Sequence, residues 1–163
     1  MNQAKVNMSF QQKMLNPFFF NSFLFLKLPM AFLAGIKLKV LSDNRAVLQM
    51  RYNYLNKNPF GSIYFACLSM AGELASGMLA ASIAYNSNPK FSMLVVGVKI
   101  NFTKKAVGLI LFECIQGEEI LATIERSIIT GTGQTINVLT VAKNEQGDVV
   151  AEFIVKWSFK LKD

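Results

Sequence analysis

The chain has 163 residues, of which 52% are hydrophobic and 17% are charged, and its formal net charge is +7. This length favours a single domain, and the composition provides a full core and excludes a disordered protein. The chain contains no histidine, which excludes Ser-His-Asp and Cys-His triads and histidine metal sites, so any proton transfer must use other side chains or water.

The N-terminal segment is aromatic and carries few charges. Residues 14–26 include five phenylalanines and no charged side chain, but this run is shorter than the roughly 20 residues that a membrane-spanning helix needs. We predict one amphipathic helix over residues 8–28 that packs its aromatic face on the domain and ends at Pro29. Peripheral membrane contact by the phenylalanines is a less favoured alternative.

Two strands and a long apolar helix are predicted next. Apolar residues alternate over 36–40 and 46–52, with a turn at 42–44, which is typical of a β-hairpin. After a loop over 53–60, residues 62–85 are almost wholly small or apolar, as in a buried helix. Glu73 is the one charged residue in that helix. A lone buried carboxylate must find a partner, take up a proton or do chemistry.

The remaining chain predicts more strands. Period-two or continuous apolar runs cover 96–103, 106–114, 136–142 and 149–159, whereas residues 117–129 fit either a helix or a continuation of the sheet. The expected fold class is α+β, with a mostly antiparallel sheet wrapped around one long central helix. Cys67 and Cys114 have neither metal nor disulfide spacing, which is typical of a cytoplasmic protein.

Residues 58–77 resemble the hotdog-fold thioesterases, most closely the phenylacetate-degradation type and a related branch of single-domain members. These proteins carry Asn or His, then Gly-x-[Ile/Leu]-His-Gly-Gly, then a helix with an acid. Asn58, Gly61, Ile63 and Glu73 fit this order, while Tyr64-Phe65-Ala66 stands in place of His-Gly-Gly. The resemblance implies an N-terminal helical extension over 1–30 and a hotdog domain over 31–163 that hydrolyses acyl-CoA thioesters.

Thioester hydrolysis needs a base to activate water and a stabiliser for the oxyanion. Burial raises the pKa expected for Glu73 toward neutrality, which suits a general base. The amide groups at the helix start, near Tyr64, Phe65 and Ala66, have no partners within the helix and suit a carbonyl oxygen. We predict Glu73 as the base and the Phe65 N–H as the oxyanion donor.

Distance along the helix then predicts an assembly. Phe65 and Glu73 are eight residues apart, or about 12 Å at 1.5 Å per residue, so one thioester carbon cannot contact both. We therefore expect a homodimer with shared sites, and a dimer of dimers is left open. In the shared site, Asn58 orients the water or the partner's carboxylate, and Asn58 or Tyr64 takes over from the missing histidine. Ser76 and Gly77 are expected to line the same groove.

Substrate contacts are assigned to the residues beside this motif and after the strand over 96–103. Gly61 and Ala66 are expected to border the thioester, and Thr103, Lys104 and Lys105 to contact coenzyme A phosphates. Coenzyme A enters only as part of the substrate, an acyl carrier protein is the other candidate carrier, and no separate cofactor or metal is expected. The scattered basic residues predict no nucleic-acid partner.

Each assignment has a structural alternative. Glu73 is otherwise an acid paired with a cation or tyrosine, Asn58 a turn residue, Tyr64 a packing residue and the two lysines a solvated strand end. The alternative function is a non-catalytic protein that binds acyl-CoA or a fatty acid in the same tunnel.

Overall fold

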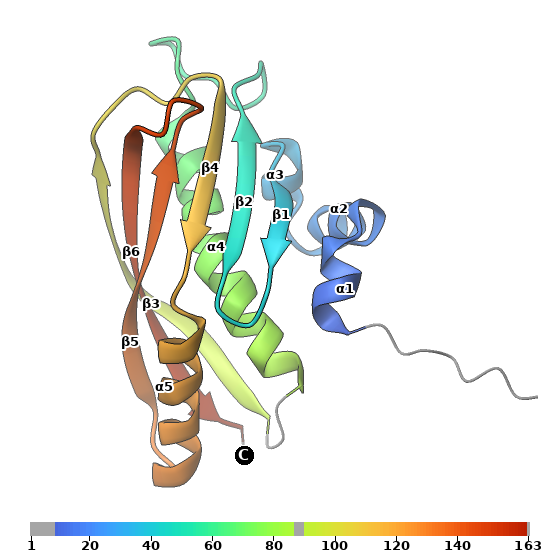
Figure 1. The fold of residues 1–163 in the computed structure, drawn as a ribbon, viewed down its shortest axis with the longest axis vertical. Helices are drawn as coiled ribbons and strands as arrows, with labels where there is room; N and C mark the ends of the chain where they lie inside the picture. The colour runs from blue at the N-terminus through green and yellow to red at the C-terminus, as the bar shows by residue number, and fades with distance from the viewer. Residues whose placement is uncertain (1–8, 87–89, 163) are drawn as a thin grey trace, which may run out of the picture.

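A six-stranded antiparallel sheet curves around one long helix in the computed structural model, which describes residues 9–86 and 90–162 (Figure 1). Its order is β1-β2-β4-β5-β6-β3, and every neighbouring pair is antiparallel. The strands are β1 (Lys37–Leu41), β2 (Ala46–Arg51), β3 (Phe91–Phe102), β4 (Leu109–Cys114), β5 (Gln134–Lys143) and β6 (Val149–Leu161). The helix is α4 (Phe65–Asn86). The predicted α+β architecture is confirmed.

The core forms where alternate residues of the sheet meet small residues of α4. Strand β6 turns Phe153, Val155 and Trp157 inward, and all three are buried. Gly72 of α4 lies so close to Phe153 that an added Cβ would overlap the ring, within 2.6 Å of Cδ1. The absence of a side chain at this position therefore sets how closely the helix approaches the sheet.

Replacing Gly72 by Ala is expected to lower the free energy of unfolding by about 1–3 kcal/mol, the usual cost of overpacking a core. Gly77 in the same helix is the matched control, because a Cβ there would lie 3.4 Å from the nearest Trp157 atom. Since alanine favours a helix over glycine by about 1 kcal/mol, Gly77→Ala should be neutral or stabilising. Urea unfolding of both variants measures the difference, and equal stabilities would contradict a tight contact at Gly72.

The N-terminal segment differs from the prediction of one helix over 8–28, of which residue 8 lies outside the described residues. It forms three short helices, α1 (Phe10–Leu15), α2 (Pro17–Lys27) and α3 (Pro29–Leu33). Asn16 caps α2 by accepting a 2.9 Å hydrogen bond from the Phe18 N–H. Proline at the first helical position of α2 and α3 cannot continue a preceding helix. The two prolines therefore divide the segment.

The other differences are at element boundaries. The ambiguous residues 117–129 form α5 (Gly117–Thr130), which buries Ile120 and Ile124 and packs against β5, β6 and α4. Helix α4 begins three residues later than predicted, at Phe65, and β3 begins earlier, at Phe91.

In the described part of the chain, α4 is the one helix with the length and hydropathy of a membrane span, over Phe65–Tyr85. However, 67% of that stretch is buried inside the protein. The central helix of a sheet-wrapped core has the same composition, because most of its surface contacts apolar groups.

Candidate functional site

The loop before α4 is fixed by a buried residue that the sequence analysis does not single out. Asn56 donates its side-chain amide to the carbonyl oxygens of Ala34 (3.0 Å) and Arg51 (2.9 Å), and its backbone carbonyl accepts the Tyr64 N–H at 2.8 Å. These bonds tie the entry to α4 to β2 and to the end of α3. Nothing in the local sequence distinguishes Asn56 from Asn53 or Asn58.

Asn58 shapes the turn that follows. Its side-chain oxygen accepts the N–H groups of Phe60 (2.9 Å) and Ser62 (3.2 Å), and its amide donates to the Ser62 hydroxyl at 2.9 Å. Gly61 has a φ of +75°, a conformation that other L-residues rarely adopt. Both ends of the Asn58 side chain are thus engaged within its own loop, which favours the turn role over the orientation of a water molecule.

The start of α4 presents free amide groups. The first backbone bond into the helix goes from the Leu68 N–H to the Tyr64 carbonyl at 3.1 Å. The N–H groups of Phe65, Ala66 and Cys67 have no hydrogen-bond partner among the described residues. They lie at the positive end of the helix dipole and suit an anionic oxygen.

A cavity of about 610 Å³ lies at this helix start. It brings together six of the predicted site residues, namely Asn58, Tyr64, Phe65, Thr103, Lys104 and Lys105. Gly61 and Ala66 are in the adjacent backbone but do not line it. The rings of Tyr64 and Phe65 meet edge to face with centroids 4.9 Å apart. Phe102, from the end of β3, lies 6.3 Å from the Phe65 ring in the same cavity.

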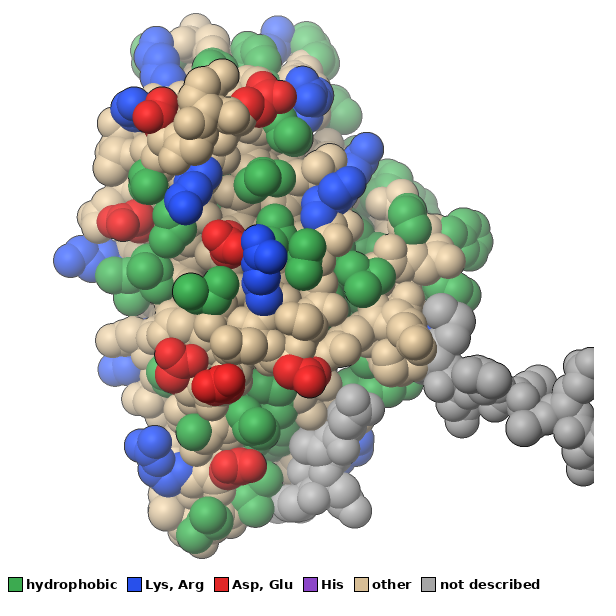
Figure 2. Space-filling view, viewed as in Figure 1, with side chains coloured by type: hydrophobic (Ala, Val, Ile, Leu, Met, Phe, Trp, Pro, Cys, Tyr) green, Lys and Arg blue, Asp and Glu red, His purple; other side chains and the backbone are tan. Residues whose placement is uncertain are grey.

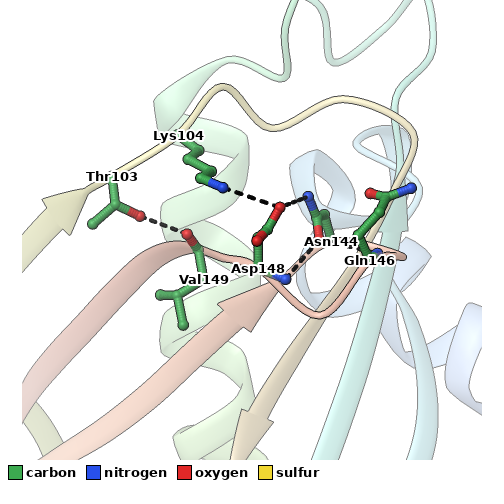
Figure 3. A network of polar contacts seen from close by, with 6 residues as sticks. All are labelled: Thr103, Lys104, Asn144, Gln146, Asp148 and Val149. Carbon is green, nitrogen blue, oxygen red and sulfur yellow. Dashed lines mark hydrogen bonds and ion pairs between the residues drawn. The ribbon is translucent and has the colours of Figure 1, made fainter.

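Thr103, Lys104 and Lys105 of this cavity already have partners, and Figure 3 shows those of Thr103 and Lys104. The Lys104 ammonium pairs with the Asp148 carboxylate at 3.0 Å and, chiefly through this hydrogen bond, lowers the pKa of Asp148. Thr103 donates its hydroxyl to the Val149 carbonyl at 2.6 Å, and Lys105 donates to the Phe60 carbonyl at 3.1 Å. Lys104 is held by a carboxylate, whereas Lys105 is held only by a neutral carbonyl. Lys105 is therefore the more available of the two lysines for the predicted phosphate contacts.

Glu73 lies in a second cavity. This cavity, of about 240 Å³, lies between α4 and the junction of α2 with α3, and is lined by Lys27, Leu28, Pro29, Met30, Ala31, Met70, Glu73 and Leu74. The Glu73 side chain forms no hydrogen bond and no ion pair with any described residue, including Lys27. Burial raises the pKa of the Glu73 carboxyl group. Within one subunit, Glu73 is therefore not a structural acid paired with a described cation or tyrosine.

Ser76 and Gly77 were predicted to line the same groove as Glu73, but neither lines this cavity. Ser76 is fully buried, accepts the Trp157 indole N–H at 2.9 Å and donates to the Glu73 carbonyl at 2.9 Å. Its role is to anchor α4 to β6. Gly77 is also buried, and a Cβ there would lie 3.4 Å from Glu73 Oε1, which is an ordinary van der Waals contact.

The helix start and Glu73 face separate spaces within one subunit. The two cavities have no lining residue in common. This separation agrees with the distance of about 12 Å along the helix. No group of three or more Cys, Asp or Glu side chains suited to a metal ion is found within residues 9–86 and 90–162.

The comparisons with known proteins concern both family and fold. Residues 18–159 match a family described as a domain of unknown function, DUF4442. No curated protein matches the chain. A solved structure from Pseudomonas aeruginosa, described as a protein of unknown function and probable thioesterase, has a TM-score of 0.77 at 22% identity, covering 90% of this chain and 97% of that one.

Two further solved structures have the same fold. A protein of unknown function from Chlorobaculum tepidum has a TM-score of 0.75 at 15% identity, covering 91% of this chain and 98% of its own. A thioesterase from Haemophilus influenzae has a TM-score of 0.66 at 10% identity, with coverages of 89% and 90%. At such identities the likeness establishes the fold and not the activity.

Proposed function

We propose a thioester hydrolase function for this chain, which belongs to the DUF4442 family and has the hotdog fold. The substrate is an acyl-CoA thioester with a fatty or aromatic acyl group. Glu73 is the general base, and the Phe65 N–H of a second subunit binds the oxyanion. The thioesterase descriptions of the Pseudomonas and Haemophilus proteins support this reaction class.

One observation carries the proposal, namely the unpaired Glu73 carboxylate beside an apolar cavity. Glu73 is half-buried, and a carboxylate held there without a cation or a hydrogen-bond donor among the described residues has a free-energy cost that a packing role does not require. The same burial raises the pKa of the group, which makes it a stronger base once it is ionised. An acid kept in such surroundings is typical of a site at which it transfers protons.

The edge strand β3 supports a homodimer. It ends the sheet, pairs only with β6 and is 12 residues long without proline. Its exposed apolar residues are Leu94, Val96, Val98 and Phe102. A long uncovered edge of this kind pairs readily with another strand. Two β3 strands paired across a two-fold axis would make one continuous sheet.

The same edge is next to the helix-start cavity, because Phe102 belongs to both. Pairing at β3 would therefore carry the free amides of one subunit toward the partner. We infer that the Glu73 cavity of that partner completes the site. Two equivalent sites would result from the symmetry.

In this site Glu73 accepts a proton from a water molecule as the water oxygen attacks the thioester carbonyl carbon. The carbonyl oxygen gains the negative charge and accepts the hydrogen bond of the partner's Phe65 N–H. The carbon–sulfur bond then breaks, the sulfur takes the proton back from Glu73, and the products are a carboxylic acid and a thiol. Met30 and Met70 line the acyl side with adaptable side chains.

A panel of acyl-CoA and acyl-carrier thioesters tests the reaction class. We expect release of free thiol, with larger kcat/KM for apolar acyl groups that fit a cavity of about 240 Å³. Tight binding of these compounds without release of thiol would instead favour the alternative, a non-catalytic acyl-CoA or fatty-acid binding protein. The missing His-Gly-Gly motif is the feature that favours this alternative.

A further inference from the structure

Helices α2 and α3 have an exposed apolar face as well as a buried one. Phe20 and Leu24 point inward and are fully buried, so they anchor α2 to the domain. The opposite side is exposed, with Phe18 at 74%, Phe25 at 61% and Leu26 at 72%. The aromatic side chains expected to pack on the domain are thus divided between two faces. The outer ones do not contribute to the core.

This outer face, here called the α2–α3 face, is continuous. Phe25 of α2 contacts Phe32 of α3 edge to face, with centroids 5.5 Å apart. Between residues 15 and 33 the exposed large apolar side chains are Leu15, Phe18, Phe19, Phe25, Leu26, Leu28, Met30, Phe32 and Leu33. Figure 2 shows hydrophobic side chains over the α2 and α3 region, with no acidic side chain among them. Contiguous apolar surface of this extent is typical of an interaction site.

The charge of the segment defines the partner. Residues 9–42 contain four lysines and no acidic residue. Lys13 and Lys27 belong to α1 and α2, and Lys37 and Lys39 are exposed on β1, which both helices contact. Asp43, the next acid along the chain, accepts a hydrogen bond from Gln11, and Glu73 lies in its cavity. Exposed aromatic and aliphatic side chains flanked by lysines fit an anionic lipid surface.

We propose that the α2–α3 face docks on an anionic lipid bilayer. Phe18, Phe25 and Leu26 enter the boundary between headgroups and acyl chains, and the lysines contact the headgroups. A second copy of the chain is the weaker candidate for this face. The uncovered strand edge suited to self-association is β3, at the opposite end of the sheet from β1 and the helices that pack on it.

The position of this face relates it to the Glu73 cavity. Lys27, Leu28 and Met30, at the junction of α2 and α3, also line that cavity. A docked bilayer would therefore lie beside residues that border this cavity. The docking itself does not depend on catalysis, so its test and the thioesterase assay can fail separately.

Co-sedimentation of the full chain with vesicles tests the proposal. The parent should bind vesicles containing about one quarter phosphatidylglycerol more strongly than pure phosphatidylcholine, and about 0.5 M NaCl should weaken the binding. The variant F18S/F25S/L26S should lose binding about tenfold or more. Ile129→Ser is the matched control, because Ile129 is 84% exposed and belongs to α5, which lies on the other side of the molecule from α2 and α3 (Figure 1). Equal binding by the parent and the triple variant, or none by the parent, would overturn the proposal.

Two measurements cover the remaining outcomes. Sedimentation velocity of the triple variant detects a change of oligomeric state, and conversion to a smaller species would assign the face to a second copy and overturn the proposal. The variant Phe25→Trp is the direct probe if the triple variant does not fold. Its added emission should shift to the blue and be quenched by brominated lipid, whereas Trp157 is buried and should not respond. No shift with anionic vesicles would contradict insertion.

Discussion

Replacing Glu73 by Gln is expected to lower kcat for acyl-CoA hydrolysis by about 10²–10⁴-fold, the usual contribution of a positioned general base. Glutamine has nearly the shape of the acid but cannot take a proton from water. Because the cavity keeps its form, KM should change little. Thiol release under saturating substrate measures the effect.

The pH dependence of the parent identifies the same group. Burial raises the pKa of Glu73, and only its ionised form acts as base. The value of kcat/KM should therefore rise with pH through this raised pKa and level off above it. The remaining activity of Glu73→Gln should lack this acidic limb. Activity equal to the parent, with the same profile, would remove Glu73 from the mechanism.

The free energy of unfolding of the parent should fall with rising pH, whereas its kcat/KM should rise. Since the folded-state pKa of Glu73 lies above its unfolded value of about 4.3, folding favours the protonated form. The parent therefore loses stability as pH rises through the folded-state pKa. At neutral pH the uncharged glutamine should raise the free energy of unfolding relative to the parent, and below about pH 4 this difference should vanish. Glu125→Gln, at an exposed site on α5, is the control for both measurements.

The strands were predictable because alternation of side chains encodes the two faces of a sheet. In β6 the alternate residues Phe153, Val155 and Trp157 are buried as the pattern indicates. The N-terminal segment was predicted less well, because both sides of α2 are apolar and the pattern does not show which side packs. Phe20 is buried and Phe18 exposed for reasons of tertiary contact alone. Pro17 begins a new helix, α2, because proline at this position cannot continue α1.

The candidate site also has one part that the sequence predicts and one part that depends on contacts between distant residues. Its helix-start half was predictable because Asn58, Tyr64 and Phe65 are neighbours in the chain, and one cavity does contain them. The environment of Glu73 depends on α2 and α3, more than 40 residues earlier. The hydrogen bond that turns Ser76 toward Trp157 joins residues 81 positions apart. No local pattern specifies such contacts, so the sequence could not predict that Ser76 anchors α4 to β6 and does not line the groove.

Replacing Phe65 by Pro should lower kcat by about 10²–10³-fold, because it removes one oxyanion donor. Proline is tolerated at the first position of a helix, which Phe65 occupies in α4. Tyr64 lies outside the helix, so the restriction that proline places on its predecessor acts on no residue of α4. Phe65→Ala is the matched control, because it removes the same ring but keeps the N–H. Its activity should stay well above that of Phe65→Pro.

Mixing the two inactive proteins then tests whether the site is shared. Each heterodimer of Glu73→Gln with Phe65→Pro would contain one site with both defects and one site with neither. Random exchange of subunits gives heterodimers in about half of the dimers, so about a quarter of the parental activity should return. If both groups instead acted within one subunit, every site would keep a defect and nothing would return. Sedimentation of the mixture shows that exchange has occurred, so an inactive mixture of exchanged dimers would contradict the shared site.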